Sequence, residues 1–154
     1  MLLRYCRGID RIELDLVRDC YHPDALDDHG AFRGGVEDFL TWIGRLLPRY
    51  GVTTHTLANM LIEGHPRRDD VARVETYGVA EHQTPDGPPE LNLTIAFRYL
   101  DRFERRDGEW RVADRVCTTE WVRVNDPATI FPIDERFLRG GRGDHSDPVF
   151  RPWD

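Results

Sequence analysis

The chain has 154 residues, a length that favours one domain built around a single core. Its net charge of -7 argues against a nucleic-acid partner, and no apolar run approaches the ~20 residues that span a bilayer. All 21 basic residues are arginine, so lysine Schiff-base chemistry and a lysine general base are excluded.

Helical patterns come first along the chain. Residues 2–10 read as a helix that begins at the first residue without an N-cap. This abrupt beginning suggests that the start of the chain is clipped, or that it was chosen downstream of the true start. Residues 12–20 have apolar side chains at helical spacing and predict a second, short helix. Pro23 and the following glycines predict a loop with one short strand before a third helix, which covers residues 36–50.

Strand patterns fill the rest of the ordered chain. Asp107-Gly108 predicts a tight hairpin turn, because glycine tolerates positive φ. The segments that alternate, or are rich in β-branched and aromatic residues, are 52–63, 70–83, 90–106 and 109–124.

The order of elements, helices first and a strand meander second, predicts an α+β fold. We expect a strongly curved antiparallel sheet with the N-terminal helices packed on its concave side, enclosing a pocket. The predicted domain covers residues 1–124. Residues 125–154 are rich in proline, glycine and arginine and predict an extended C-terminal tail.

His55 lies in the segment VTTHTLANMLIE, where strand alternation places it on the same face as Leu57, Asn59 and Leu61. A single histidine on such a face is either a core residue or a proton carrier that faces a pocket. A carboxylate beside it would fix its tautomer and make it a competent base.

Tyr5 and Asp10 are the first candidates to accompany His55. They are five residues apart, so at ~100° per residue they do not share a helical face. Asp10 would have to lie where the helix ends, with its carboxylate turned inward. The alternative is a solvated Asp10 at the helix end and a Tyr5 that only fills the core.

Arg115 is predicted to share a strand face with Thr119 and Trp121. Its guanidinium could lie in the pocket and stabilise a developing anion. The alternative is an Arg115 that pairs with Asp114, Glu120 or solvent.

The segment YHPDALDDHG could suggest a metal site, because histidines and carboxylates are common metal ligands. Its spacing matches no metal signature, so we interpret it as an acidic loop. The sequence also contains no GxSxG motif, phosphate-binding loop, CxxC pair or dinucleotide fingerprint. We therefore expect neither a metal nor a cofactor.

Three stretches resemble the SnoaL-like family, which belongs to the cone-shaped α+β superfamily named after nuclear transport factor. They are YCRGIDRIELDLVRDCYHPDALDDHGAFRGGVEDFLTWI, HTLANMLIE and YLDRFERRDGEWRVADRVCTTEWVRV, within residues 1 to about 124. The resemblance implies the fold described above. By analogy it also implies a homodimer or homotrimer.

Two enzymes of that superfamily carry a similar set of site residues. In the bile-acid dehydratase and the hexachlorocyclohexane dehydrochlorinase, an aspartate ends the first helix and a histidine lies on the first long strand. Asp10 and His55 match these positions. Tyr5 matches a tyrosine of the dehydratase, and Arg115 matches an arginine of the dehydrochlorinase.

A second acid of the dehydratase has no unique match here. Glu75, Glu81 and His82 all lie in the corresponding strand, and the sequence does not choose among them. Asn59, Thr119 and Trp121 are expected in the substrate pocket because they share strand faces with His55 or Arg115.

The resemblance implies a cofactor-independent lyase of the dehydratase type, or an isomerase, that acts on a polycyclic or aromatic small hydrophobic molecule. His55 would take the proton, Asp10 would orient it, and Tyr5 or Arg115 would assist the leaving group or the enolate-like charge. The alternative is a non-catalytic small-molecule-binding or assembly module on the same fold.

We expect a cytoplasmic protein. The segment MLLRYCRGIDR meets charge too early for a secretory signal peptide, and the cysteines Cys6, Cys20 and Cys117 are an odd number without metal spacing. The expected partners are a small hydrophobic substrate and further copies of the chain, without nucleic acid or membrane.

Overall fold

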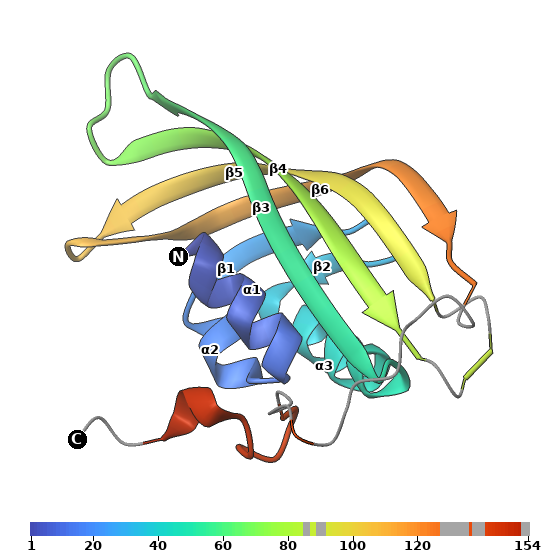
Figure 1. Cartoon of the computed structure of the whole chain (residues 1–154). Coiled ribbons are helices and arrows are strands. Elements are labelled where there is room, and N and C mark those ends of the chain that lie inside the picture. Colours follow the sequence, from blue (N-terminus) through green and yellow to red (C-terminus); the bar gives the residue numbers. More distant parts are fainter. Residues whose placement is uncertain (85–86, 89–91, 127–135, 137–140, 152–154) are drawn as a thin grey trace.

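Three helices pack against one curved sheet in the computed structural model, which describes residues 1–84, 87–88, 92–126, 136 and 141–151 (Figure 1). The helices are α1 (Leu2–Arg11), α2 (Leu14–Arg18) and α3 (Val36–Leu46), which continues into the 3-10 turn η1 (Leu47–Arg49). The strands are β1 (Tyr21–Asp28), β2 (Arg33–Gly35), β3 (Val52–Gly64), β4 (Val71–Gln83), β5 (Leu93–Arg106) and β6 (Glu109–Val124). The predicted α+β class is confirmed. No helix among the described residues is long and apolar enough to cross a membrane.

The described strands form one six-stranded sheet in the order β2-β1-β6-β5-β4-β3. Strands β3 to β6 form an antiparallel meander. Asp107 (φ 52°) and Gly108 (φ 83°) form the turn between β5 and β6, which confirms the predicted hairpin. The sheet curves around the helices and does not close, so α1 and α3 lie on its concave side (Figure 1).

The segment 21–35 differs from its prediction as a loop with one short strand. It forms two strands, β1 and β2, because β1 pairs in parallel with β6 and antiparallel with β2. Tyr21, Ala25 and Asp27 of β1 are buried. The intervening His22, Pro23 and Asp24 conceal the strand alternation, so this part of the sheet is recognisable only once β6 is in place.

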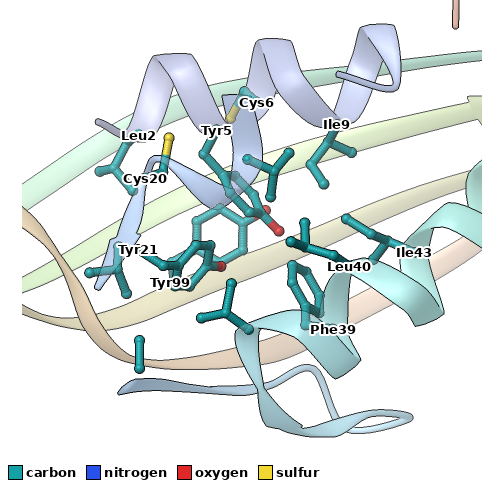
Figure 2. Packing of buried hydrophobic residues seen from close by; sticks show 14 of the residues in the cluster. Leu2, Tyr5, Cys6, Ile9, Cys20, Tyr21, Phe39, Leu40, Ile43 and Tyr99 are labelled. Atoms are coloured by element: carbon teal, nitrogen blue, oxygen red, sulfur yellow. The ribbon is translucent and has the colours of Figure 1, made fainter. Parts of the chain in front are cut away.

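The core lies between the helices and the concave face of the sheet. Figure 2 shows Tyr5 pointing from α1 towards Phe39 of α3 and Tyr99 of the sheet. Tyr5 and Ile9 lie one turn apart on α1, as do Phe39 and Ile43 on α3, and so each pair faces the sheet together.

Part of the predicted tail, 125–154, folds back onto the end of α1. The Gly143 N–H donates to the Arg11 carbonyl at 2.9 Å, and Arg11 forms an ion pair with Asp147 at 3.0 Å. The short 3-10 helix η4 (Pro148–Phe150) follows. Asn125 extends the end of β6, because its N–H donates to the Asn92 carbonyl at 2.7 Å. Residues 127–135, 137–140 and 152–154 of the predicted tail lie outside the described residues.

Candidate functional site

A cavity of about 200 Å³ lies between the helices and the sheet. Tyr5, Phe39 and Trp42 line it from the helices, and Phe97 and Tyr99 line it from β5. The imidazoles of His29, His55 and His82 also lie in its wall. The cavity therefore combines aromatic surface with several groups that can carry a proton.

Asp10 and His55 form a two-point contact at one side of this cavity. The His55 ring Nδ1 lies 2.7 Å from Asp10 Oδ1, and the His55 backbone N–H donates to Asp10 Oδ2 at 2.9 Å. The side chain of His55 is 9% exposed and that of Asp10 is 13% exposed. Donation from Nδ1–H to the carboxylate leaves the Nε2 lone pair as the basic site of the imidazole.

Asp10 reaches His55 because α1 ends at this point. Ile12 adopts the left-handed conformation (φ 57°) and terminates the helix directly after Asp10 and Arg11. The Arg142 guanidinium holds the same end: it donates to the Asp10 carbonyl at 2.9 Å and to the Tyr50 carbonyl at 2.6 Å. Tyr5 lies five residues before Asp10 on α1 and so points in a different direction. Its side chain lines the cavity itself.

Arg115 lies behind the cavity wall and does not line it. It is fully buried and donates two hydrogen bonds to Asp101, at 2.7 and 2.8 Å. Its guanidinium carbon lies 4.0 Å from the ring centre of Tyr99 and 4.3 Å from that of Tyr5. Burial is the largest single influence and opposes its charge, but Asp101 together with Tyr21 and Tyr5 outweighs it, so the pKa of Arg115 lies well above its ordinary value. Arg115 therefore does not point its guanidinium into the cavity, and its partner is neither Asp114 nor Glu120 but Asp101.

Two of the three expected pocket residues lie outside the cavity. Thr119 lines it, whereas Asn59 is exposed and Trp121 is 48% exposed. The β3–β4 register shifts between Leu57 and Met60, and the β5–β6 register shifts between Thr119 and Trp121. Each bulge inserts one residue, so the alternation that begins at His55 or Arg115 changes face before it reaches Asn59 or Trp121.

Of the three residues left open in β4, the structure places His82 in the cavity wall. Glu75 pairs instead with Arg98 at 2.8 Å, and Glu81 accepts from the Thr94 hydroxyl at 2.9 Å. His82 Nδ1 is buried without a hydrogen-bond partner among the described residues. Burial, reinforced by repulsion from His55, lowers the pKa of His82 to about 4. We therefore treat His82 as a neutral polar group.

Sequence reasoning missed a second Asp–His pair, Asp27 and His29. The His29 Nδ1 contacts Asp27 Oδ1, and Asp27 is fully buried although the surrounding segment reads as an acidic loop. The Tyr21 hydroxyl donates to Asp27 Oδ2 at 2.7 Å. The signal in the sequence is the Asp-x-His spacing of Asp27 and His29, which follows the apolar residues Tyr21 and Ala25 at the spacing of a strand.

The metal reading of this segment gains no support from the geometry. Among the described residues, no group of three or more histidine, cysteine, aspartate or glutamate side chains is placed to hold a metal ion. Asp24 instead pairs with Arg106 at 2.6 Å, and His22 Nε2 lies 2.9 Å from the Glu104 carbonyl oxygen.

The SnoaL-like domain family matches residues 1–116, which cover both Asp–His pairs and Arg115. The chain belongs to this family. No curated protein matches the sequence of this SnoaL-like chain.

Solved structures share the fold at low sequence identity. The LinA crystal structure aligns with a TM-score of 0.73 and 20% identity, covering 86% of this chain and 88% of that one. The hexachlorocyclohexane dehydrochlorinase LinA-type3 from Novosphingobium barchaimii LL02 gives 0.71 and 19%, covering 86% and 89%. A putative scytalone dehydratase from Novosphingobium aromaticivorans gives 0.71 and 16%, covering 81% and 83%. These likenesses establish the cone-shaped fold of the SnoaL-like chain, which proteins named as a dehydrochlorinase and a putative dehydratase also adopt.

Proposed function

We propose that this protein is a cofactor-independent lyase of the dehydratase type, with His55 as the general base. The observation that carries the proposal is the two-point contact between Asp10 and His55 beside an aromatic cavity. Membership in the SnoaL-like family and the fold shared with a dehydrochlorinase and a putative dehydratase support it.

In this mechanism, His55 Nε2 removes a proton from a carbon next to an activating carbonyl. The electrons of that C–H bond form the new C=C bond as the leaving group departs from the neighbouring carbon. Asp10 holds the Nδ1–H tautomer and stabilises the imidazolium that forms. General base catalysis of this kind contributes about 10²- to 10⁴-fold in rate.

The size and lining of the cavity support a compact aromatic molecule as the substrate. Its volume of about 200 Å³ is below the ~300–1,000 Å³ typical of pockets for drug-sized ligands. Phe39, Trp42 and Phe97 offer ring faces and edges against which a flat ligand can pack. We therefore favour a substrate of one or two rings over a steroid.

An isomerase would use the same base and return the proton to another carbon. A non-catalytic binding module is the second candidate, and the position in β4 that lines the cavity favours it, because it holds His82 and not a second acid. Binding and turnover measured on the same compound separate the two: a module that only binds needs no general base, so the wild type and His55→Gln would bind a panel compound and neither would convert it. The homodimer or homotrimer and the cytoplasmic location stay predictions.

The test is turnover of a panel of hydroxylated bicyclic ketones and steroids by the wild-type protein and by His55→Gln. We expect His55→Gln to lose about 10²- to 10⁴-fold in kcat/KM on any compound that the wild type converts. The control is His65→Gln, because His65 is an exposed imidazole on the loop after β3. Equal turnover by wild type and His55→Gln would contradict the proposal, as would a panel without any converted compound.

A further inference from the structure

A continuous chain of hydrogen bonds runs through the core to the second imidazole in the cavity wall. Arg115 donates to the Tyr21 hydroxyl oxygen at 3.2 Å, and that hydroxyl donates to Asp27 Oδ2 at 2.7 Å. The other oxygen of Asp27 contacts His29 Nδ1. Because Asp27 is fully buried, these contacts replace its hydration and fix His29 with Nδ1 as the donor.

The outer nitrogen of His29 is directed at Tyr5. His29 Nε2 lies 3.4 Å from the Tyr5 hydroxyl, and both residues line the cavity. Burial, opposed in part by Arg115, raises the pKa of Tyr5 well above its ordinary value. The Tyr5 hydroxyl therefore keeps its proton and can pass one on only while it receives another from His29.

The charges around this chain favour a cation at its end. Asp27 and Asp101 are buried carboxylates, whereas Arg115 is the one buried arginine among the described residues in contact with this group. An imidazolium at His29 brings the cluster to two negative and two positive charges. The positive charge of a protonated His29 is therefore balanced by the buried carboxylates, although most of the cavity wall is apolar.

The backbone and its neighbours hold His29 in place. Its N–H donates to the Phe32 carbonyl and its own carbonyl accepts from the Ala31 N–H, both at 2.8 Å. Its ring stacks on Phe39 with ring centres 5.0 Å apart. The side chain is 16% exposed, so the imidazole can exchange protons with solvent between turnovers. These features suit a proton donor that must stay fixed.

We propose that the Tyr5 hydroxyl protonates the leaving oxygen of the substrate and that His29, held by Asp27, supplies the proton that Tyr5 gives up. The inference rests on the proposed lyase function and adds to it a proton relay from His29 through Tyr5.

The step balances when the leaving group is hydroxide. His55 takes the C–H proton, the C–O bond breaks, and the C=C bond forms. The Tyr5 hydroxyl gives its proton to the departing oxygen and receives the Nε2 proton of His29, so water leaves. His55 ends protonated and His29 ends neutral, and proton exchange with solvent restores both.

The discriminating experiment compares two leaving groups on one skeleton. Hydroxide departs readily only when protonated, whereas chloride needs no proton. The probes are 3-hydroxy-1-tetralone and 3-chloro-1-tetralone, both of which yield 1-naphthol after elimination and tautomerisation. Rates are corrected for the reaction without protein. We expect His29→Gln to slow loss of water about 100-fold and loss of chloride less than about 3-fold.

Two further variants guard against a folding artefact. Tyr5→Phe keeps the ring and removes only the hydroxyl, and Asp27→Asn keeps the shape of the buried side chain. Both should show the same selective loss on the hydroxyl substrate. Circular dichroism establishes that each variant is folded, and a folded variant with equal losses on both substrates overturns the inference.

The outcomes separate this inference from the proposed function. If His55→Gln abolishes both eliminations while His29→Gln changes neither, His55 remains the base and the role of His29 is overturned. If the wild type eliminates neither leaving group, or His55→Gln has no effect on either, the proposed function fails and the inference fails with it.

Discussion

The two Asp–His pairs in the cavity wall differ in how the chain assembles them. Asp10 and His55 are 45 residues apart and meet only when α1 packs on β3. Asp27 and His29 are two residues apart at the end of one strand. The distant pair is invisible to periodicity and was found through a family resemblance. The local pair is visible as Asp-x-His but was read as an acidic loop.

The pairs also differ in their surroundings. Asp10 is 13% exposed and its carboxylate contacts both the ring and the backbone of His55. Asp27 is fully buried and connects through Tyr21 to the Asp101–Arg115 ion pair. The first arrangement resembles a base poised beside a ligand. The second resembles a proton donor anchored in the core. The following predictions test the groups that hold or adjoin each pair.

The largest effect is expected from the carboxylate of the first pair. Asp10→Asn removes the negative charge that stabilises the His55 imidazolium, so elimination should fall by about 10²- to 10⁴-fold. The loss should be the same for the hydroxyl and chloride probes, because base catalysis serves both. A loss confined to the hydroxyl probe would make Asp10 part of the acid side and contradict the division of roles. Steady-state kinetics with both tetralones measures it.

The buried Asp101–Arg115 ion pair, which lies behind the second Asp–His pair, should contribute strongly to the stability of the fold. Arg115→Met leaves Asp101 buried without its partner, and we expect the free energy of unfolding to fall by about 3–5 kcal/mol. Urea denaturation measures it. The control is Arg98→Met, because Arg98 pairs with Glu75 and Glu120 in partly exposed positions and should cost less than about 1 kcal/mol. Equal losses of unfolding free energy in Arg115→Met and Arg98→Met would mean that the buried ion pair contributes no more than a partly exposed one.

His82, adjacent to the first pair, should make stability depend on pH. Its pKa is about 4 when folded and 6.5 in the reference state, so the unfolded chain binds more protons between these values. Stability is therefore fully present above pH ~6.5 and is lost as the pH falls towards ~4, by roughly 3 kcal/mol. His82→Gln should flatten this part of the curve of unfolding free energy against pH. An unchanged curve would show that His82 is not held neutral.

A smaller effect is expected at the end of α1. Arg142→Met removes the hydrogen bonds to the Asp10 and Tyr50 carbonyls and should destabilise the fold by about 1–2 kcal/mol. The control is Arg67→Met, because Arg67 is exposed. Thermal unfolding of both variants measures the difference. If Arg142→Met melts with the wild type, segment 141–147 does not hold Asp10 in place.

The sequence predicted the main elements because their patterns are local. Apolar spacing located α3, and Asp107-Gly108 placed the β5–β6 hairpin. The faces of long strands were less predictable. Asn59 and Trp121 were assigned by alternation from His55 and Arg115, and a bulge in each strand reversed that assignment.

The partner of Arg115 could not be predicted for the same reason. Counting back from the Asp107-Gly108 turn pairs Arg106 with Glu109 and would place Asp101 opposite Asp114. A shift between Arg102 and Phe103 moves Asp101 opposite Arg115 instead, and their side chains meet on the concave face. A change of one residue in register thus decides which residue of β5 lies opposite Arg115.

The central claim, that His55 is a base acting inside the cavity, can be tested without any leaving group. In D₂O, 1-tetralone should exchange the protons on the carbon next to its carbonyl when the wild-type protein is added, as followed by ¹H NMR. Exchange should be lost in His55→Gln and retained in His29→Gln. Exchange no faster than without protein, or equally fast in His55→Gln, would contradict the account.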